Sequence, residues 1–127
     1  MNVTHKLEMV NGITITVIAD KEFMIENAQQ FLDVVFNLPS DVIVFHKENF
    51  PETFFDLKTG LAGDILQKVV TYSRQIAIVG DFSNYESKSL RAFIYESNKS
   101  NTVVFVSSHD EALDKLSKEE FFLFGIV

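Results

Sequence analysis

Hydrophobic and polar residues follow one another along this chain in patterns that predict alternating strands and helices. Some short runs are apolar without interruption, which is typical of strands buried on both faces of a parallel or mixed sheet. These runs are residues 42–45, 76–79 and 103–106. Between the runs, apolar positions return every three or four residues, which predicts amphipathic helices.

A hairpin is predicted at the start of the chain. Asn11-Gly12 separates two strand-like segments, residues 6–10 and 13–18, and this dipeptide suits the two-residue turn with positive backbone angles. In the second segment, isoleucine and valine alternate with threonine, as in a strand with one dry face. The predicted order is therefore strand, strand, helix, strand, helix, strand, helix, strand, helix.

The predicted fold class is α/β: a single domain, residues 1–127, with a single mixed, mostly parallel sheet of four to six strands, an N-terminal hairpin, and helices packed on the sheet. Helices with clear apolar spacing are expected at residues 25–38, 57–72 and 87–98. A last helix is expected after Ser108, which can form a capping box with Glu111. Residues 121–127 predict either an edge strand or an apolar tail packed on the body.

Residues 57–72 and the strand after them form the centre of the predicted fold. The broad apolar face of this helix needs a sheet to cover, and residues 76–79 are predicted to be a central strand. Gly80-Asp81 ends that strand, which places Asp81 at the carboxyl ends of the strands, where open α/β sheets bind ligands. The alternative is that Asp81 only ends the strand or caps a turn.

Composition and charge exclude several classes of site and partner. A chain of 127 residues without cysteine can bury a sizeable core, and it cannot form disulfides or thiolate metal sites. The net charge of -7 argues against nucleic acid or an anionic membrane as a partner. No signal-peptide pattern is found, and no apolar run approaches the roughly 18 residues of a membrane helix, so a cytoplasmic location is expected.

Neither a metal nor a cofactor is predicted. His5, His46 and His109 lack metal-ligand spacing. Gly60-Leu-Ala-Gly63 lacks the Lys-Ser/Thr ending of a phosphate loop, and it falls within a helical pattern. Its small residues are expected to pack a helix closely against the sheet.

His46 and Asp81 are the candidate catalytic residues. Each follows an apolar strand, so both are expected on the edge where parallel strands end. A histidine beside a carboxylate can act as a base with an orienting partner, which makes a hydrolase or transferase one alternative. The competing interpretation is a strand-end histidine that is hydrogen-bonded to its own loop. The chain has no Gly-x-Ser-x-Gly motif for a serine nucleophile.

Three stretches carry a resemblance to known families. They are Phe55-Asp56-Leu57-Lys58-Thr59-Gly60-Leu61, then Ile76-Ala-Ile-Val-Gly-Asp81, then Val104-Phe-Val-Ser-Ser108 with Glu111-Ala112. With these residues the chain resembles, over most of its length, a bacterial family catalogued as a domain of unknown function, number 4180. In its order of elements it is similar to STAS and anti-sigma-factor-antagonist domains.

The resemblance to STAS domains implies a regulatory role. Those domains carry an aspartate, then Ser-Ser or Ser-Thr and Gly-Leu, at the start of the helix after the third strand, and the serine can accept a phosphate that a partner reads. Asp56 and Thr59-Gly60-Leu61 look similar, but Leu57-Lys58 stands where the family has one serine. Thr59 is therefore either a phosphate acceptor or a helix-capping threonine.

The function expected from the sequence is a non-enzymatic, STAS-like regulatory module that binds a protein partner through residues 50–59 and the adjoining helix. The predicted contact residues are Phe50, Phe54, Phe55, Asp56 and Thr59. Glu48, Glu52 and Asp56 fall around the same loop and form either an acidic lip or a solvated acidic loop.

The phenylalanine content leaves two further alternatives open. Thirteen phenylalanines without a tryptophan exceed the obvious needs of one small core, so some are expected at an interface or in a pocket. Self-association into a homo-oligomer is one possibility. The other is a carrier with a cavity for a small apolar ligand, and the resemblance supports it because a related branch of similar folds has been thought to hold such ligands.

Overall fold

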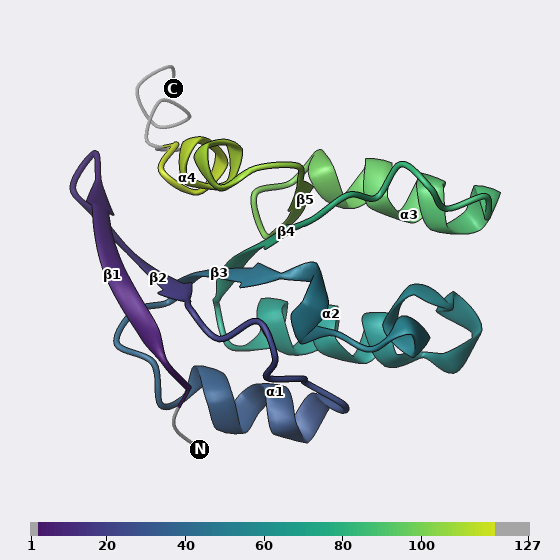
Figure 1. Cartoon of the computed structure of the whole chain (residues 1–127), viewed down its shortest axis with the longest axis horizontal. Coiled ribbons are helices and arrows are strands. Elements are labelled where there is room, and N and C mark those ends of the chain that lie inside the picture. The colour runs from purple at the N-terminus through teal and green to yellow at the C-terminus, as the bar shows by residue number, and fades with distance from the viewer. Residues whose placement is uncertain (1–2, 119–127) are drawn as a thin grey trace.

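The computed structural model describes residues 3–118 and contains one sheet with helices on both faces (Figure 1). The strands are β1 (His5–Val10), β2 (Ile13–Ile18), β3 (Val42–His46), β4 (Gln75–Val79) and β5 (Val103–Val106). The helices are α1 (Ala28–Val35), α2 (Leu61–Thr71), α3 (Lys88–Asn98) and α4 (His109–Leu116). Short 3-10 turns at Lys47–Asn49, Glu52–Phe55 and Leu57–Thr59 lie between β3 and α2.

The five strands lie side by side in the order in which they occur in the sequence. β1 pairs with β2 in the antiparallel sense, and each later neighbour is parallel. The sheet is therefore mixed and mostly parallel, which confirms the predicted fold class. β4, which the sequence predicted as a central strand, lies inside the sheet between β3 and β5, and β3 is the middle strand.

Helices cover both faces of the sheet, which explains the uninterrupted apolar strands. On one face, residues of α1, α2 and α3 form a buried cluster with Ile43 and Ile76. On the opposite face, Ala112 and Leu116 of α4 pack with Ala77. A strand between two layers of helices must be apolar at every position, because its side chains point alternately to each layer.

Left-handed backbone angles occur at both of the predicted glycine-containing segments. Asn11 and Gly12 have φ angles of 52° and 80°. These angles confirm the predicted turn between β1 and β2. Gly60 has a φ of 81° and separates the Leu57–Thr59 turn from α2, so the prediction of one helix over residues 57–72 is wrong at its first turn. A left-handed residue cannot continue a right-handed helix.

The expected close packing through Gly60 and Gly63 is also wrong. A Cβ atom built on either glycine would meet nothing within 4 Å. Ala62, which lies between them, is buried and makes the contact with the core instead. The first helix is shorter than the predicted residues 25–38, because Asn27 caps it by accepting the backbone N–H of Gln30 at 2.8 Å.

The edge of the sheet at β5 is closed by side chains of α3. The amide of Asn98 donates to the carbonyl of Phe105 at 3.0 Å and accepts the backbone N–H of the same residue at 2.7 Å. The hydroxyl of Ser97 donates to the carbonyl of Val103 at 2.6 Å. These contacts use backbone groups that would otherwise be free to pair with another strand.

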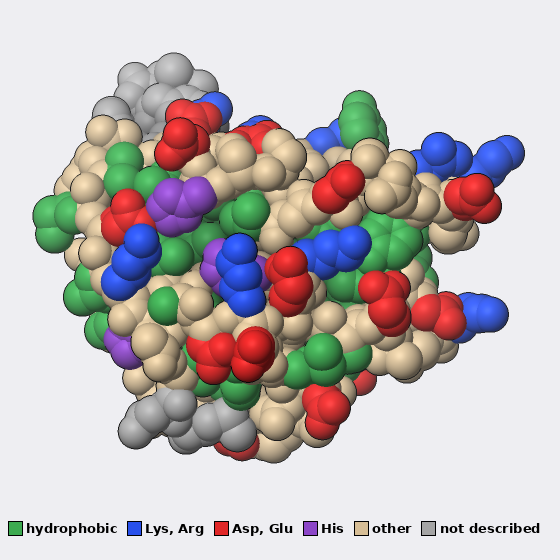
Figure 2. Space-filling model, in the orientation of Figure 1, with side chains coloured by type: hydrophobic (Ala, Val, Ile, Leu, Met, Phe, Trp, Pro, Cys, Tyr) green, Lys and Arg blue, Asp and Glu red, His purple; other side chains and the backbone are tan. Residues whose placement is uncertain are grey.

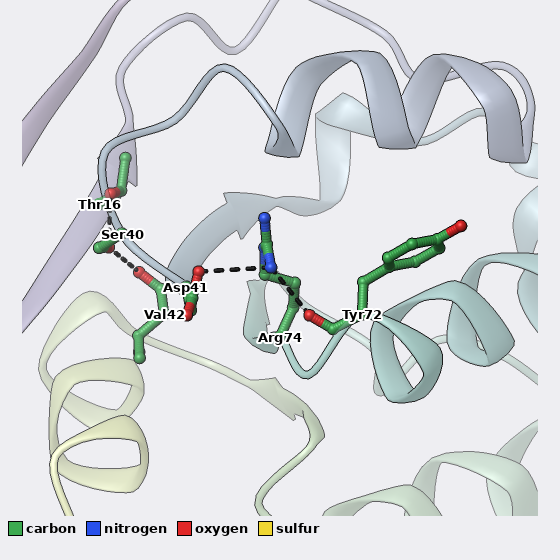
Figure 3. Close-up of polar contacts among 6 residues, drawn as sticks. All are labelled: Thr16, Ser40, Asp41, Val42, Tyr72 and Arg74. Carbon is green, nitrogen blue, oxygen red and sulfur yellow. Dashed lines mark hydrogen bonds and ion pairs between the residues drawn. The ribbon is translucent and has the colours of Figure 1, made fainter.

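Polar side chains fix the amino ends of the parallel strands (Figure 3). The hydroxyl groups of Thr16 and Ser40 lie 2.7 Å apart. Nη1 of Arg74 donates to the carbonyl of Tyr72 at 2.8 Å and lies 3.3 Å from the carboxylate of Asp41. These contacts link residues that precede β3 and β4, so their role is structural.

The prediction for residues 121–127 lies outside the described residues. Within residues 3–118, none of the helices combines the length and the apolar character needed to cross a membrane.

Candidate functional site

The parallel strands end on one side of the sheet, which we call the carboxyl edge. His46 is the last residue of β3, and Asp81 lies two residues after the end of β4. β3 and β4 are parallel neighbours, so both predicted residues lie on the edge where open α/β sheets bind ligands.

His46 is held by the backbone of β2 rather than by an acidic partner. Its Nε2 lies 2.8 Å from the carbonyl oxygen of Ile18. A carbonyl can only accept a hydrogen bond, so Nε2 carries the proton. No hydrogen bond between His46 and Asp81 is found within residues 3–118, and the predicted pair of base and orienter is not assembled.

The carboxylate of Asp81 is hydrogen-bonded within its own turn. Its Oδ1 accepts the backbone N–H of Ser83 at 2.9 Å and the hydroxyl of Ser83 at 2.6 Å. The hydroxyl and then the amide of Ser83 lower the pKa of the Asp81 carboxyl, because both stabilise the ionised form. A carboxylate with a lowered pKa is a weak general base at neutral pH. Asp81 also borders a hollow of about 370 Å³ with Ser107 and Glu111.

Lys47 connects the ends of β3 and β4, and it is not one of the site residues predicted from the sequence. Its Nζ donates to the carbonyl of Asp81 at 3.1 Å and lies 4.8 Å from the centre of the Tyr85 ring. Its stem contacts Gly80 so closely that a Cβ atom there would lie 2.6 Å from Cβ of Lys47. The pairing of His46 with Val79 places Lys47 and Gly80 at the next register position. The signal in the sequence is that each of the two residues comes just after one of two successive apolar runs, 42–45 and 76–79.

Replacing Gly80 by alanine is expected to lower the free energy of unfolding by about 1–3 kcal/mol, because the added methyl group overpacks the contact with Lys47. Gly63→Ala is the matched control, and we expect it to raise the free energy of unfolding by about 0.5–1 kcal/mol because Gly63 lies inside α2 with open space around it. Urea unfolding of both variants measures the difference. Equal effects at the two positions would contradict the close contact.

The loop between β3 and α2 is built on buried phenylalanines. Phe50, Phe54 and Phe55 are at most 5% exposed. Their ring centroids lie 4.7 Å apart for Phe50 and Phe54, and 4.9 Å apart for Phe54 and Phe55. Phe50, Phe54 and Phe55, which the sequence predicted as partner-contact residues, therefore fill the core, where removing large apolar surfaces from water is favourable.

Asn49 fixes the start of this loop, and nothing in its sequence context identified it. Its side chain is fully buried. Its Nδ2 donates to the carbonyls of Asp20 and Phe23 at 2.9 and 2.7 Å, and its Oδ1 accepts the backbone N–H of His46 at 2.8 Å. One side chain thus joins the segment after β2 to the segment after β3.

The remaining predicted contact residues, Asp56 and Thr59, are exposed. Oδ1 of Asp56 accepts the backbone N–H of Lys58 at 3.3 Å. The hydroxyl of Thr59 lies 2.7 Å from the carbonyl of Thr53 and 2.9 Å from that of Asp56, and it accepts the backbone N–H of Leu61 at 3.3 Å. These contacts agree with the capping interpretation of Thr59.

An acidic hollow of about 330 Å³ lies beside this loop and is lined by Glu52, Thr53, Phe55, Asp56 and Tyr85. The rings of Phe55 and Tyr85 are stacked, with centroids 5.3 Å apart and planes inclined by 20°. Glu52 and Asp56 are exposed. The hydroxyl of Tyr85 is buried and has no hydrogen-bond partner within residues 3–118.

A second hollow, of about 350 Å³, brings together histidines that are far apart in sequence. It is lined by Lys6, His46, His109 and residues 17–19. Nε2 of His109 lies 2.7 Å from a carboxylate oxygen of Glu8. Figure 2 shows histidine side chains among acidic, basic and hydrophobic ones on the face toward the viewer. Within residues 3–118, no three histidine, aspartate or glutamate side chains are grouped so that they could hold a metal ion.

Comparison with known proteins supplies the family. No curated protein and no solved structure matches the chain. A family model with the description "Domain of unknown function (DUF4180)" matches residues 10–116, from the end of β1 to the end of α4. This range contains both predicted catalytic residues and the whole loop between β3 and α2. Because the match covers most of the 127 residues, the chain belongs to the family Domain of unknown function (DUF4180).

Proposed function

We propose that this protein is a non-enzymatic regulatory or protein-interaction module that binds a basic side chain of a protein partner in the acidic hollow. The observation that carries the proposal is the pair of exposed carboxylates, Glu52 and Asp56, beside the stacked rings of Phe55 and Tyr85. A guanidinium or ammonium group can pair with the carboxylates, and its aliphatic stem can lie beside the half-buried Tyr85, whose ring already has Nζ of Lys47 4.8 Å from its centre. The hollow therefore suits an arginine or lysine of the partner.

The rigidity of the loop supports binding in a preformed site. The rings of Phe50, Phe54 and Phe55 are packed against one another, and Thr59 is hydrogen-bonded to the backbone on both sides of Asp56. A loop that is already ordered loses little conformational entropy when a partner binds. The buried phenylalanines contribute to recognition by holding the acidic residues in place.

The hydrogen bonds of the carboxyl edge favour this module over the enzyme alternative. His46 is bound to Ile18, and Asp81 is bound to Ser83. The apolar-ligand alternative has less support, because the phenylalanine rings contact one another and fill the space that a ligand would need.

A STAS-like layout is part of the proposal. The strands follow one another in sequence order across the sheet, and Gly60-Leu61 lies at the start of the helix after the third strand, as the resemblance implies. The hydrogen bonds of Thr59 support a capping role for this residue within that layout.

Reversing both charges of the hollow tests the proposed function. We expect E52K/D56K to lose affinity for protein partners by at least about tenfold, because a basic side chain then meets two cations. The matched control is D33K/E96K, which makes the same change in net charge at exposed positions on α1 and α3. Affinity capture from lysate with quantitative mass spectrometry provides the comparison. Recovery of the same proteins in the same amounts by E52K/D56K and by wild type would contradict the proposal.

A further inference from the structure

The exposed edge of strand β1 differs from the closed edge of β5. The backbone N–H of Ala19 donates to the carbonyl of Thr4 at 2.9 Å, and β1 and β2 pair residue by residue up to Val10 and Ile13. In an antiparallel pair the hydrogen-bonded residues alternate, so His5, Leu7 and Met9 direct their backbone groups away from β2. No side chain within residues 3–118 is hydrogen-bonded to those groups as Asn98 is bonded to β5.

The side chains of β1 are apolar on one face and charged on the other. Leu7 and Met9 are 53% and 72% exposed, which is unusual for two large apolar residues on neighbouring positions of one face. Lys6 and Glu8 occupy the opposite face. An isolated lysine on an edge strand discourages pairing. A lysine followed two residues later by a glutamate can favour pairing. A two-fold axis between them places the lysine of one copy opposite the glutamate of the second copy.

We propose that two copies of this chain associate by antiparallel pairing of β1 with β1 about a two-fold axis at Leu7. In this register Leu7 faces Leu7 of the second copy and His5 faces Met9, and these pairs use the free backbone groups. Lys6 faces Glu8 of the second copy on both sides of the axis. Oε2 of Glu8 contacts His109 of its own chain at 2.7 Å, so Oε1 is the oxygen that meets the lysine, and the pairing contains two ion pairs. Any other register that keeps the backbone hydrogen bonds breaks this symmetric match of charges.

The proposed pairing also covers the exposed apolar residues. Leu7 and Met9 of each copy come together on one face of the joined sheets, where direct and diagonal neighbours across the strands make contact. The contact is small, so we expect a weak, concentration-dependent dimer. It uses a surface separate from the acidic hollow, and it leaves that hollow free for the proposed partner.

Charge exchange tests the pairing. Lys6→Glu replaces both ion pairs by two pairs of like charges, and it is expected to raise the dimer dissociation constant at least about tenfold. The exchanged variant K6E/E8K restores opposite charges at both positions and is expected to recover the association. It also removes the contact of Glu8 with His109, which circular dichroism monitors as a change in folding. Sedimentation of the full chain over a wide concentration range measures both effects, and circular dichroism verifies that each variant is folded. A wild type that stays monomeric at every concentration would overturn the proposal.

Cross-linking tests the register itself. The natural chain has no cysteine, so Lys6→Cys and Glu8→Cys each introduce a single thiol. These positions face each other as a non-hydrogen-bonded pair with Cα atoms about 4.5 Å apart, which suits a disulfide. We expect oxidation of a mixture of the two variants to give the mixed dimer, and oxidation of either variant alone to give far less product. Equal yields from all three solutions would overturn the proposed register.

The segment 119–127, which lies outside the described residues, is the alternative occupant of this edge. If a chain ending at Lys118 associates and cross-links while the full chain does not, the segment covers β1 in the full chain and the proposal is overturned. If both chains give the mixed cross-linked dimer, a second copy is the occupant.

Discussion

Replacing Phe54 by alanine is expected to lower the free energy of unfolding by about 3–5 kcal/mol. Phe54 is 1% exposed and lies among other rings, with centroids 4.7 Å from Phe50, 4.9 Å from Phe55 and 6.5 Å from Phe105. Removing its ring leaves a cavity, and the neighbouring rings cannot all move in to fill it. Since small proteins are stable by only about 5–15 kcal/mol, the loss is a large part of the total.

The control for Phe54 is Phe36, which is 52% exposed and contacts the ring of Tyr72 at a centroid distance of 5.1 Å. Phe36→Ala is expected to cost less than about 1.5 kcal/mol, because most of its surface stays in water in the folded protein. Urea unfolding curves provide both values. If the two substitutions cost the same, Phe54 is not a core residue, and buried rings do not hold the loop between β3 and α2.

Replacing Asn49 by alanine is expected to cost about 2–4 kcal/mol of unfolding free energy, because it leaves three partly buried backbone groups without this partner. The N–H of His46 and the carbonyls of Asp20 and Phe23 all lose a hydrogen bond from this side chain. The same change should loosen both segments at the carboxyl edge. Hydrogen exchange at the amide of His46 measures this local effect, since that amide is protected by Oδ1 of Asn49.

Asn84→Ala is the matched control for Asn49, because Asn84 is exposed in the loop between β4 and α3. A surface change of this kind is expected to alter the free energy of unfolding by no more than about 0.5 kcal/mol. Faster exchange at His46 in Asn49→Ala but not in Asn84→Ala would support the role of Asn49. An unchanged exchange rate in both variants would contradict it.

The buried phenylalanines and Asn49 both hold the loop between β3 and α2 in one arrangement. The loop between β3 and α2 contains several exposed carboxylates, which repel one another and would favour an extended, mobile chain. Buried rings and a buried amide oppose that tendency. The acidic hollow can therefore present Glu52 and Asp56 in one arrangement to a partner.

The sequence by itself determined the order of the elements and the class of the fold. Uninterrupted apolar runs predicted the strands β3, β4 and β5, and Asn11-Gly12 predicted the hairpin. These features are local, since they depend on the period of hydrophobic residues and on backbone angles of single residues. The carboxyl-edge positions of His46 and Asp81 followed from the same patterns, because each residue comes directly after a strand or its glycine.

Only the tertiary structure decided which side chains meet at that edge and which are covered. The rings of Phe50, Phe54 and Phe55 stand in a loop by sequence, and they are buried because the loop folds back over the core. His46 meets Ile18 instead of Asp81, and Asn98 closes the edge at β5 while β1 stays open. Such contacts join segments that are distant along the chain, and their formation depends on the packing of the whole sheet, which no local pattern of residues encodes.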